Sequence, residues 1–211
     1  MKLRILVASG PTQEPLDPVR FLSNYSTGTM GKYLAEAAQK TGHSLTHVQC
    51  PRDAQTAREL LKKLSSLLPK NDVLIMAAAV CDVHPASFSA GKIKKDKLSS
   101  IRLAKNPDIL ATLSKKKKKG QVFIGFGLES KDIVQNGFKK IQEKKLEAIL
   151  MQRVTKNKTP FGDKPIEAIF LEKSGQQTIF SSVTKRRIAN FLVRKVEAFY
   201  STMVAEECDT V

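Results

Sequence analysis

Two observations predict an α/β fold built on a mainly parallel, doubly wound sheet. Short apolar runs of strand length alternate with longer segments of helical period along most of the 211 residues. Near the C-terminus, residues 166–181 instead contain two short apolar runs around a Ser-Gly pair, which predicts a hairpin at the sheet edge. Together these patterns indicate a Rossmann-like, doubly wound sheet with a C-terminal edge hairpin.

Five apolar runs are expected to form the parallel strands, because each is short and reads as a buried strand. They lie at residues 3–9, 45–49, 73–80, 121–127 and 147–153. Segments of helical period lie between and after them, at residues 29–41, 53–67, 107–114, 131–145 and 184–200. Gly42 is expected to close the first helix and Asp53 to cap the second. Asn106 is expected to cap the third, with Pro107 at its first helical position.

Two long polar connections interrupt this alternation, at residues 10–31 and 81–106. Connections of this length without regular structure are uncommon in compact domains and are often binding loops. They follow the first and third strands, so both are expected at the carboxyl edge of the sheet, where ligands bind in this architecture. The chain shows no internal repeat and no composition break. This predicts a single domain over residues 1–211, with a tail at about 201–211 that could be disordered.

The composition is that of a globular protein with a strongly basic surface. The 36 Lys and Arg residues exceed the 20 Asp and Glu residues, for a formal net charge of +16. Such a charge allows nucleic-acid binding. Because the lysines are spread over the chain with few aromatic residues between them, we expect them to solvate the surface and expect no nucleic-acid partner. The run KKKKK at 115–119 is likewise expected to be a solvated loop.

Neither a membrane span nor a disulfide framework is expected. The longest apolar runs fall well short of the roughly 20 residues that a bilayer requires, and the N-terminus does not have the features of a cleaved signal. The three cysteines show no metal-ligand spacing, and their odd number disfavours a disulfide framework. These features predict a protein of the reducing cytoplasm.

The opening connection could bind an anion, although the familiar nucleotide motifs are absent. Gly10 is followed by no glycine until Gly28, which excludes GxGxxG, and the spacing around Lys32 excludes a P-loop. The segment STGTMG at 26–31 instead predicts a helix entrance whose free N–H groups and dipole would favour an anion. The alternative is an ordinary serine or threonine cap.

Two strand ends carry a pattern that suits a nucleotide. VLIMAAAVCD at 73–82 ends in three alanines, which leave room for a ring or ribose, and in Asp82, whose carboxylate could accept from hydroxyls or help hold a metal. GFGLE at 125–129 repeats the arrangement, with Phe126 able to cover a base. The alternative is that the small residues only let a helix pack closely.

Other polar side chains are less specific. Asn24 by itself would be a turn residue, and Arg20 a surface ion pair. KIKK at 92–95 suits a mobile loop that closes over a triphosphate, and Lys140 and Lys144 lie four residues apart on one helix face. Each of these lysines could equally be solvated. The histidines show no ligand spacing and no serine–histidine–aspartate set is apparent, so neither zinc chemistry nor covalent hydrolysis is predicted.

In order and spacing these segments resemble one enzyme family. GPTQEPLDPVRFLSNYSTGTMG, AAAVCDVHP, KIKK, NPDILATL and GFGLES occur as they do in phosphopantothenoylcysteine synthetase, the phosphopantothenate–cysteine ligase. The likeness covers residues 3 to about 200 and is to the bacterial, CTP-dependent type, and we expect a standalone form without the decarboxylase domain. The chain departs from the family pattern at Val83-His84, Gly127-Leu128 and Gln152-Arg153.

The resemblance implies a ligase of coenzyme A biosynthesis. The carboxylate of 4′-phosphopantothenate would attack CTP with the help of Mg²⁺, giving an acyl-cytidylate and pyrophosphate. The amine of L-cysteine would then displace CMP to form 4′-phosphopantothenoylcysteine. A homodimer is implied, and a separate phosphopantothenoylcysteine decarboxylase is a possible partner. Two alternatives stay open: a basic nucleic-acid-binding protein on a Rossmann-like scaffold, and an NAD(P)-dependent reductase.

The resemblance also implies roles for particular residues. Catalytic roles fall to Asn24, Arg20 and Lys92, of which Asn24 would handle the acyl-cytidylate. The CTP site would comprise Ala77, Ala78, Asp82, Lys92, Pro107, Asp108, Ile109, Leu110, Phe126, Lys140 and Lys144. The site for phosphopantothenate and the intermediate would comprise Arg20, Asn24, Ser26, Thr27 and Gly28. No metal ligand is assigned.

Overall fold

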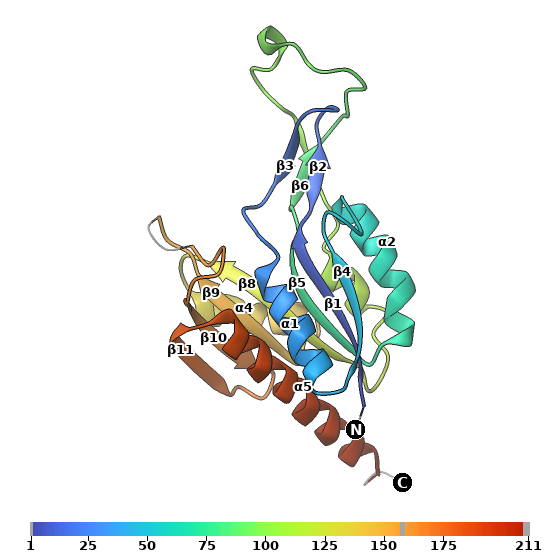
Figure 1. Cartoon of the computed structure of the whole chain (residues 1–211), viewed down its shortest axis with the longest axis vertical. Helices are drawn as coiled ribbons and strands as arrows, with labels where there is room; N and C mark the ends of the chain where they lie inside the picture. The colour runs from blue at the N-terminus through green and yellow to red at the C-terminus, as the bar shows by residue number, and fades with distance from the viewer. Residues whose placement is uncertain (1, 157–158, 209–211) are drawn as a thin grey trace.

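A seven-stranded sheet forms the centre of the molecule in the computed structural model, which describes residues 2–156 and 159–208 (Figure 1). The strand order is β11-β10-β9-β8-β5-β1-β4. β4, β1, β5, β8 and β9 run parallel, whereas β10 is antiparallel to both β9 and β11. The strands are β1 Arg4–Pro11, β4 Ser44–Gln49, β5 Val73–Ala79, β8 Val122–Glu129, β9 Ala148–Arg153, β10 Ile166–Glu172 and β11 Gln177–Val183. The predicted fold class, including the edge hairpin, is confirmed.

Helices cover both faces of the sheet. They are α1 Thr29–Lys40, α2 Ala57–Leu67, α3 Ile109–Ser114, α4 Ile133–Glu143 and α5 Lys185–Cys208. On one face, Leu34 of α1 and Leu192 of α5 join a core that includes Ile75 of β5. On the other face, Leu60 of α2 joins a core that includes Leu74 of β5. Neighbouring residues of β5 enter opposite cores because side chains alternate along a strand, which explains why this strand is apolar throughout.

The start of α2 differs from the prediction, because Thr56 caps the helix and Asp53 does not. The Thr56 hydroxyl accepts a hydrogen bond from the Glu59 amide (3.2 Å), and the Glu59 carboxylate accepts one from the Thr56 amide (3.5 Å). This reciprocal pair is a capping box. The carboxylate of Asp53 instead accepts from the Gln49 amide (2.8 Å) and pairs with Arg52 (2.9 Å), so it holds the turn after β4.

The start of α3 is also later than predicted, because Asp108 is the cap and Asn106 is not. The Asp108 carboxylate accepts from the Ala111 amide at 3.0 Å. Pro107 therefore precedes the helix. The side-chain amide of Asn106 donates to the carbonyl of Cys81 (3.0 Å), which joins this segment to the end of β5.

The last helix is longer than predicted. Thr184 lies directly before it, and its hydroxyl accepts from the Arg187 amide at 3.3 Å. The helix then continues through Cys208, so it includes part of the predicted tail, while residues 209–211 lie outside the described residues. No helix in the described part of the chain is long and apolar enough to cross a membrane.

The lysine run at 115–119 is not uniformly solvated, so this prediction is wrong for Lys117. Its side chain is only 13% exposed, and its ammonium lies 2.6 Å from the Glu147 carboxylate. The same carboxylate accepts from the Phe123 amide (2.7 Å), at the start of β8. Lys117 therefore neutralises the Glu147 carboxylate, which also accepts a hydrogen bond from the backbone of β8.

The two long connections are not irregular loops, because each contains a short antiparallel pair. β2 Gln13–Pro15 pairs with β3 Phe21–Ser23, and β6 Val83–Pro85 pairs with β7 Leu103–Lys105. β2 and β6 are in contact, and both pairs project from the carboxyl edge of the sheet with the green loop 86–102 beyond them (Figure 1). We call residues 12–23 and 83–105 the arm. Its position after β1 and β5 is the one predicted.

Candidate active site

A cavity of about 380 Å³ lies at the carboxyl edge of the sheet, beside the ends of β5 and β8 and the start of α1. A smaller cavity of about 230 Å³ shares Ala78, Asp82 and Phe126 with it. The larger cavity is lined by most of the predicted site residues: Asn24, Ser26, Thr27, Gly28, Ala77, Ala78, Asp82, Leu110, Phe126, Lys140 and Lys144. The smaller cavity adds Pro107, Asp108 and Ile109. Strand ends that are neighbours in the sheet thus assemble residues from distant parts of the sequence.

The start of α1 is open toward the larger cavity. Gly28 is the N-cap in a left-handed conformation (φ 72°), and no side chain caps the helix. The Ser26 hydroxyl accepts from the Gly28 amide (3.3 Å), and the hydroxyls of Thr27 and Thr29 bond each other (2.8 Å). The alternative of an ordinary serine or threonine cap is therefore wrong. Uncapped N–H groups at the positive end of a helix favour an anion.

Asn24 ties the opening connection to the sheet edge. Its side-chain amide donates to the carbonyl of Ala79, the last residue of β5, at 3.1 Å. Asn24 itself is exposed, and Ala77 and Ala78 before Ala79 are half-buried. The side chain of Asn24 thus lines the cavity and is hydrogen-bonded to the half-buried end of β5.

Two lysines on the helix that follows β8 supply positive charge. The Lys140 ammonium pairs with Glu129 of β8, and the Lys144 ammonium lies 2.8 Å from Asp108. Burial raises the pKa of Asp108, but the hydrogen bond from Ala111 and the contact with Lys144 lower it below its usual range overall. Both lysines line the larger cavity, so an anionic ligand could recruit them from their present partners.

Arg20 and Lys92 lie in the arm, and neither lines either cavity. The Arg20 guanidinium pairs with the buried carboxylate of Asp17 and donates to the carbonyl of Ile93 at 2.8 Å. The Ile93 amide in turn donates to Asp17 at 3.1 Å. The hydrogen bonds from Arg20, with those from backbone amides, hold the pKa of Asp17 well below its usual range despite burial. Asp17 therefore joins the two halves of the arm, while Lys92 is exposed.

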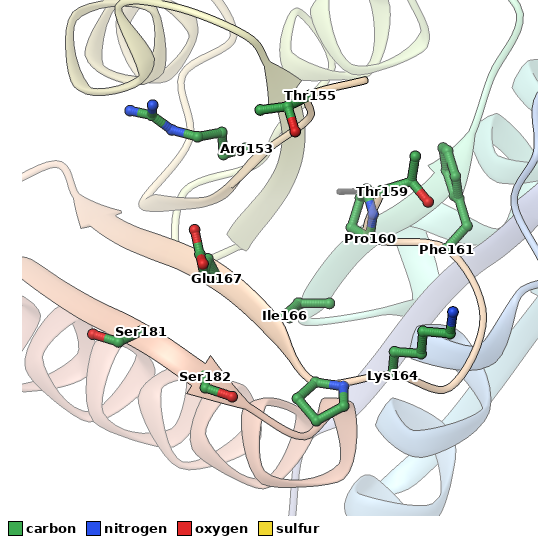
Figure 2. A pocket seen from close by; sticks show the side chains of 11 residues that line it. Arg153, Thr155, Thr159, Pro160, Phe161, Lys164, Ile166, Glu167, Ser181 and Ser182 are labelled. Atoms are coloured by element: carbon green, nitrogen blue, oxygen red, sulfur yellow. The ribbon is translucent and has the colours of Figure 1, made fainter. Parts of the chain in front are cut away.

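A segment after β9 completes the cavity and was missed by the sequence analysis. Pro160 and Phe161 line it, as does Lys185 at the start of α5. Figure 2 shows a third cavity, also of about 380 Å³, which is lined by Pro160, Phe161 and Lys164 together with Arg153. The segment thus separates two cavities, and Lys164 lines only the one in Figure 2. No motif in the sequence marks these positions.

The residues present fit a magnesium ion that arrives with a nucleotide better than a metal held by the protein alone. No group of three or more His, Cys, Asp or Glu side chains in the described residues could hold a metal. Asp82 is exposed and lines both cavities. Mg²⁺ is commonly bound by one or two carboxylates together with substrate phosphates, and Asp82 provides such a carboxylate.

The fold and the site define a class: a doubly wound α/β protein with a cationic cavity at the carboxyl edge of its sheet and an uncapped helix start in place of a glycine-rich phosphate loop. Residues 1–200 match the family described as the DNA/pantothenate metabolism flavoprotein C-terminal domain. The chain belongs to this family.

Two similar proteins have different names: one is a decarboxylase and the other is a coenzyme A biosynthesis protein. Over 206 residues the chain is 35% identical to a cysteine/cysteine sulfinic acid decarboxylase from an unknown prokaryotic organism, covering 92% of the chain and 57% of that relative. Over 161 residues it is 37% identical to the coenzyme A biosynthesis bifunctional protein CoaBC of Borreliella burgdorferi, covering 70% of the chain and 41% of that relative. The chain thus spans about half the length of these relatives.

A solved structure matches along nearly its whole length. The crystal structure of the C-terminal domain of a CoaBC protein superposes with a TM-score of 0.77 at 27% identity. The match covers 95% of this chain and 96% of that one. The region that the chain shares with CoaBC is therefore the C-terminal domain.

Proposed function

We propose that the chain is a phosphopantothenate–cysteine ligase of coenzyme A biosynthesis, which uses CTP to join 4′-phosphopantothenate to L-cysteine. The observation that carries the proposal is an uncapped helix start and two lysines facing one cavity, in a chain related to the C-terminal domain of CoaBC. A ligase of this kind must hold two anionic substrates side by side. The helix start suits one of them and the lysines suit the other.

The reaction needs no nucleophile from the protein. The acid's carboxylate oxygen attacks the α-phosphorus of CTP, and the bond to pyrophosphate breaks. The cysteine amine then attacks the acyl carbon, loses a proton, and the bond to CMP breaks. Burial raises the pKa of Cys50 to about 12 and also raises that of Cys81, so neither thiol is poised to act as a nucleophile. The protein's contribution is positioning and charge stabilisation.

The two cavities suit the two substrates. The smaller one, at Pro107 to Ile109, suits the nucleoside, and Phe126 can cover its base. Lys140 and Lys144 would hold the triphosphate, and Asp82 would help hold Mg²⁺, which neutralises triphosphate charge when bound. Ser26 to Gly28 and Asn24 would hold the acid substrate and the acyl-cytidylate.

We further propose a homodimer. The arm exposes large apolar side chains, among them Val19 (60% exposed), Phe21 (51%) and Phe88 (58%), and Ile179 on the edge strand β11 is 70% exposed. Apolar surface gathered on a projecting element is typical of an interface. Light scattering should give about twice the chain mass of 23.4 kDa, and a mass near that of one chain would contradict the dimer. The longer relatives also make a separate decarboxylase a candidate partner.

The proposed activity is tested by pyrophosphate release. The purified protein is incubated with phosphopantothenate, Mg²⁺ and either CTP or ATP, and then with cysteine. We expect pyrophosphate with CTP in preference to ATP, because a site built to hydrogen-bond one base edge leaves groups unpaired against another. Equal rates would remove the preference for CTP and leave the ligase. No pyrophosphate with either nucleotide, together with salt-dependent binding to RNA, would favour the nucleic-acid alternative. Hydride transfer from NAD(P)H would favour the reductase.

A further inference from the structure

Lys185 is placed where a lysine is electrostatically unfavourable. It is the first residue of α5, where the helix dipole is positive and a cation is disfavoured. The residue is only 5% exposed, although lysine is almost never buried without a partner. Burial lowers the pKa of Lys185, and the charge of Asp163 only partly offsets this. A negative charge near the Lys185 ammonium would therefore stabilise its charged form.

The described part of the chain gives Lys185 little compensation. Its ammonium donates to the backbone carbonyl of Gly162, and no carboxylate lies within ion-pair distance in the described residues. Asp163 is exposed and accepts a hydrogen bond from the Tyr33 hydroxyl at 2.7 Å. One carbonyl compensates a buried ammonium poorly, because a buried charge needs a counter-charge as well as hydrogen bonds. A counter-charge would therefore have to come from outside the described residues, and a bound anion can supply it.

The side chain faces a place where an anion can enter. Lys185 lines the larger cavity together with Thr27, Gly28 and Thr29 at the uncapped start of α1. α1 and α5 pack side by side, and Arg186 at the start of α5 pairs with Glu36 in the second half of α1 (2.7 Å). Two positive helix ends and a buried ammonium thus converge on one part of the cavity, which is typical of a phosphate site.

The position of Lys185 in the cavity indicates which anion it meets. The smaller cavity, assigned above to the nucleoside, includes Lys144 but not Lys185. Lys185, Phe161 and the start of α1 line the larger cavity and are absent from the lining of the smaller one. The acid substrate has two anionic groups, and its carboxylate must lie at the α-phosphorus of the nucleotide. Its phosphate must therefore lie away from the nucleotide, and Lys185 is a cation of the larger cavity that does not line the smaller one.

We propose that Lys185 binds the phosphate monoester of the acid substrate and makes the enzyme specific for the phosphorylated acid. This inference rests on the proposed ligase function. On binding, the ammonium exchanges the Gly162 carbonyl for a phosphate oxygen. Because Gly162 follows Phe161, the same exchange would release the segment that forms this wall of the cavity.

The test compares two acids that differ only in the phosphate: phosphopantothenate and pantothenate. Lys185→Met removes the charge and keeps the length of the side chain, and Lys164→Met is the matched control, because Lys164 lines only the cavity in Figure 2. We expect Lys185→Met to lower kcat/KM for phosphopantothenate by on the order of 10- to 100-fold, as for a lost charge-assisted hydrogen bond. The value for pantothenate and the KM for CTP should change much less. Lys164→Met should behave as wild type.

A purely structural role would give a different result. If Lys185→Met lowers kcat/KM for both acids by the same factor, Lys185 only supports the segment, and the inference is wrong. Lys185→Arg keeps the charge and should retain much of the preference for the phosphorylated acid. Calorimetric binding of the two acids, without CTP, tests the phosphate contact independently of turnover. Tighter binding of phosphopantothenate that Lys185→Met abolishes would support the contact even if wild-type protein releases no pyrophosphate, and unchanged binding would exclude it.

Discussion

The cavity and the arm both begin at the carboxyl ends of β1 and β5, yet they are built differently. The cavity is lined by the ends of strands and the starts of helices, and these elements pack into the two buried cores. The arm consists of three-residue strands, one 3-10 turn at Lys95–Lys97 and loops, and it exposes large apolar side chains such as Phe21 and Phe88. The sheet edge thus carries a preformed cavity, whereas the arm presents exposed apolar surface.

This difference separates the three residues to which catalytic roles were assigned. Asn24 is bonded to the end of β5 in the cavity, whereas Arg20 is bonded to Asp17 and Lys92 is exposed in the arm. For the proposed reaction the arm must bring Lys92 to the triphosphate, either by closing on its own cavity or by reaching that of a second copy. Variants in the two regions should therefore fail at different steps.

The largest effect is expected from the tip of the arm. Lys92→Gln removes a charge that would stabilise the departing pyrophosphate, and should slow acyl-cytidylate formation by on the order of 10²-fold or more. Lys97→Gln, in the same exposed loop, is the control and should retain near wild-type rates. Rapid quench with CTP and phosphopantothenate measures the step. A wild-type rate for Lys92→Gln would mean that the arm does not take part in activation.

A change in the cavity should block the second step instead. Asn24→Asp keeps the side-chain shape but places a negative charge beside the acyl-cytidylate phosphate, so amide formation should slow by on the order of 10-fold or more relative to activation. The intermediate should then persist after cysteine is added, as measured by mass spectrometry of quenched samples. If the intermediate clears as fast as in wild type, Asn24 has no role in this step.

A smaller effect is expected at the nucleotide end of the cavity. Lys144→Met removes a cation 2.8 Å from Asp108 that would contact the triphosphate, and should raise the KM for CTP by about 10-fold. Lys139→Met on the exposed face of α4 is the matched control, because its side chain is 70% exposed. Steady-state kinetics with varied CTP distinguish the two variants. Equal KM values would place the triphosphate elsewhere.

The smallest effect is expected in the arm, where a change of pH should leave the contact between Asp17 and Ile93 intact. The pKa of Asp17 is lowered in the folded protein, so its contribution is complete above the ordinary aspartate pKa of about 3.9 and is lost only as pH falls through the lower folded value. The amide NMR shift of Ile93, which donates to Asp17, should therefore stay constant from about pH 8 to 5. Asp17→Asn should shift this signal at every pH. A wild-type titration near pH 6 would contradict the assigned contact.

Strand ends were predictable from the sequence because their pattern is local. Apolar runs located every parallel strand, and the polar residues that follow a parallel strand must meet at one edge of the sheet. The structure brings Asn24, Asp82 and Phe126 to one cavity at this edge, while the roles that the family resemblance assigned to them stay predictions. Helix starts were less predictable, because Asp53 and Thr56 are both common cap residues, and only the fold decides whether the carboxylate or the hydroxyl caps the helix.

What the sequence could not predict depends on contacts between distant segments. Lys185 is one lysine among 36 basic residues, and only the packing of α5 beside α1 buries it at the cavity. The arm shows the opposite case. Its strands are three residues long, too short for a periodic pattern to be recognised, and the Asp17 contact that joins them spans more than 70 residues of sequence between Asp17 and Ile93.

The proposed reaction is tested most directly by following one oxygen atom. Phosphopantothenate labelled with oxygen-18 at both carboxylate positions is incubated with the protein, CTP, Mg²⁺ and cysteine, and the products are separated for mass spectrometry. If the carboxylate attacks the α-phosphorus, CMP gains one labelled oxygen, the amide keeps the other and pyrophosphate gains none. Amide formation with unlabelled CMP, or with the label in inorganic phosphate, would contradict an acyl-cytidylate and the account built on it.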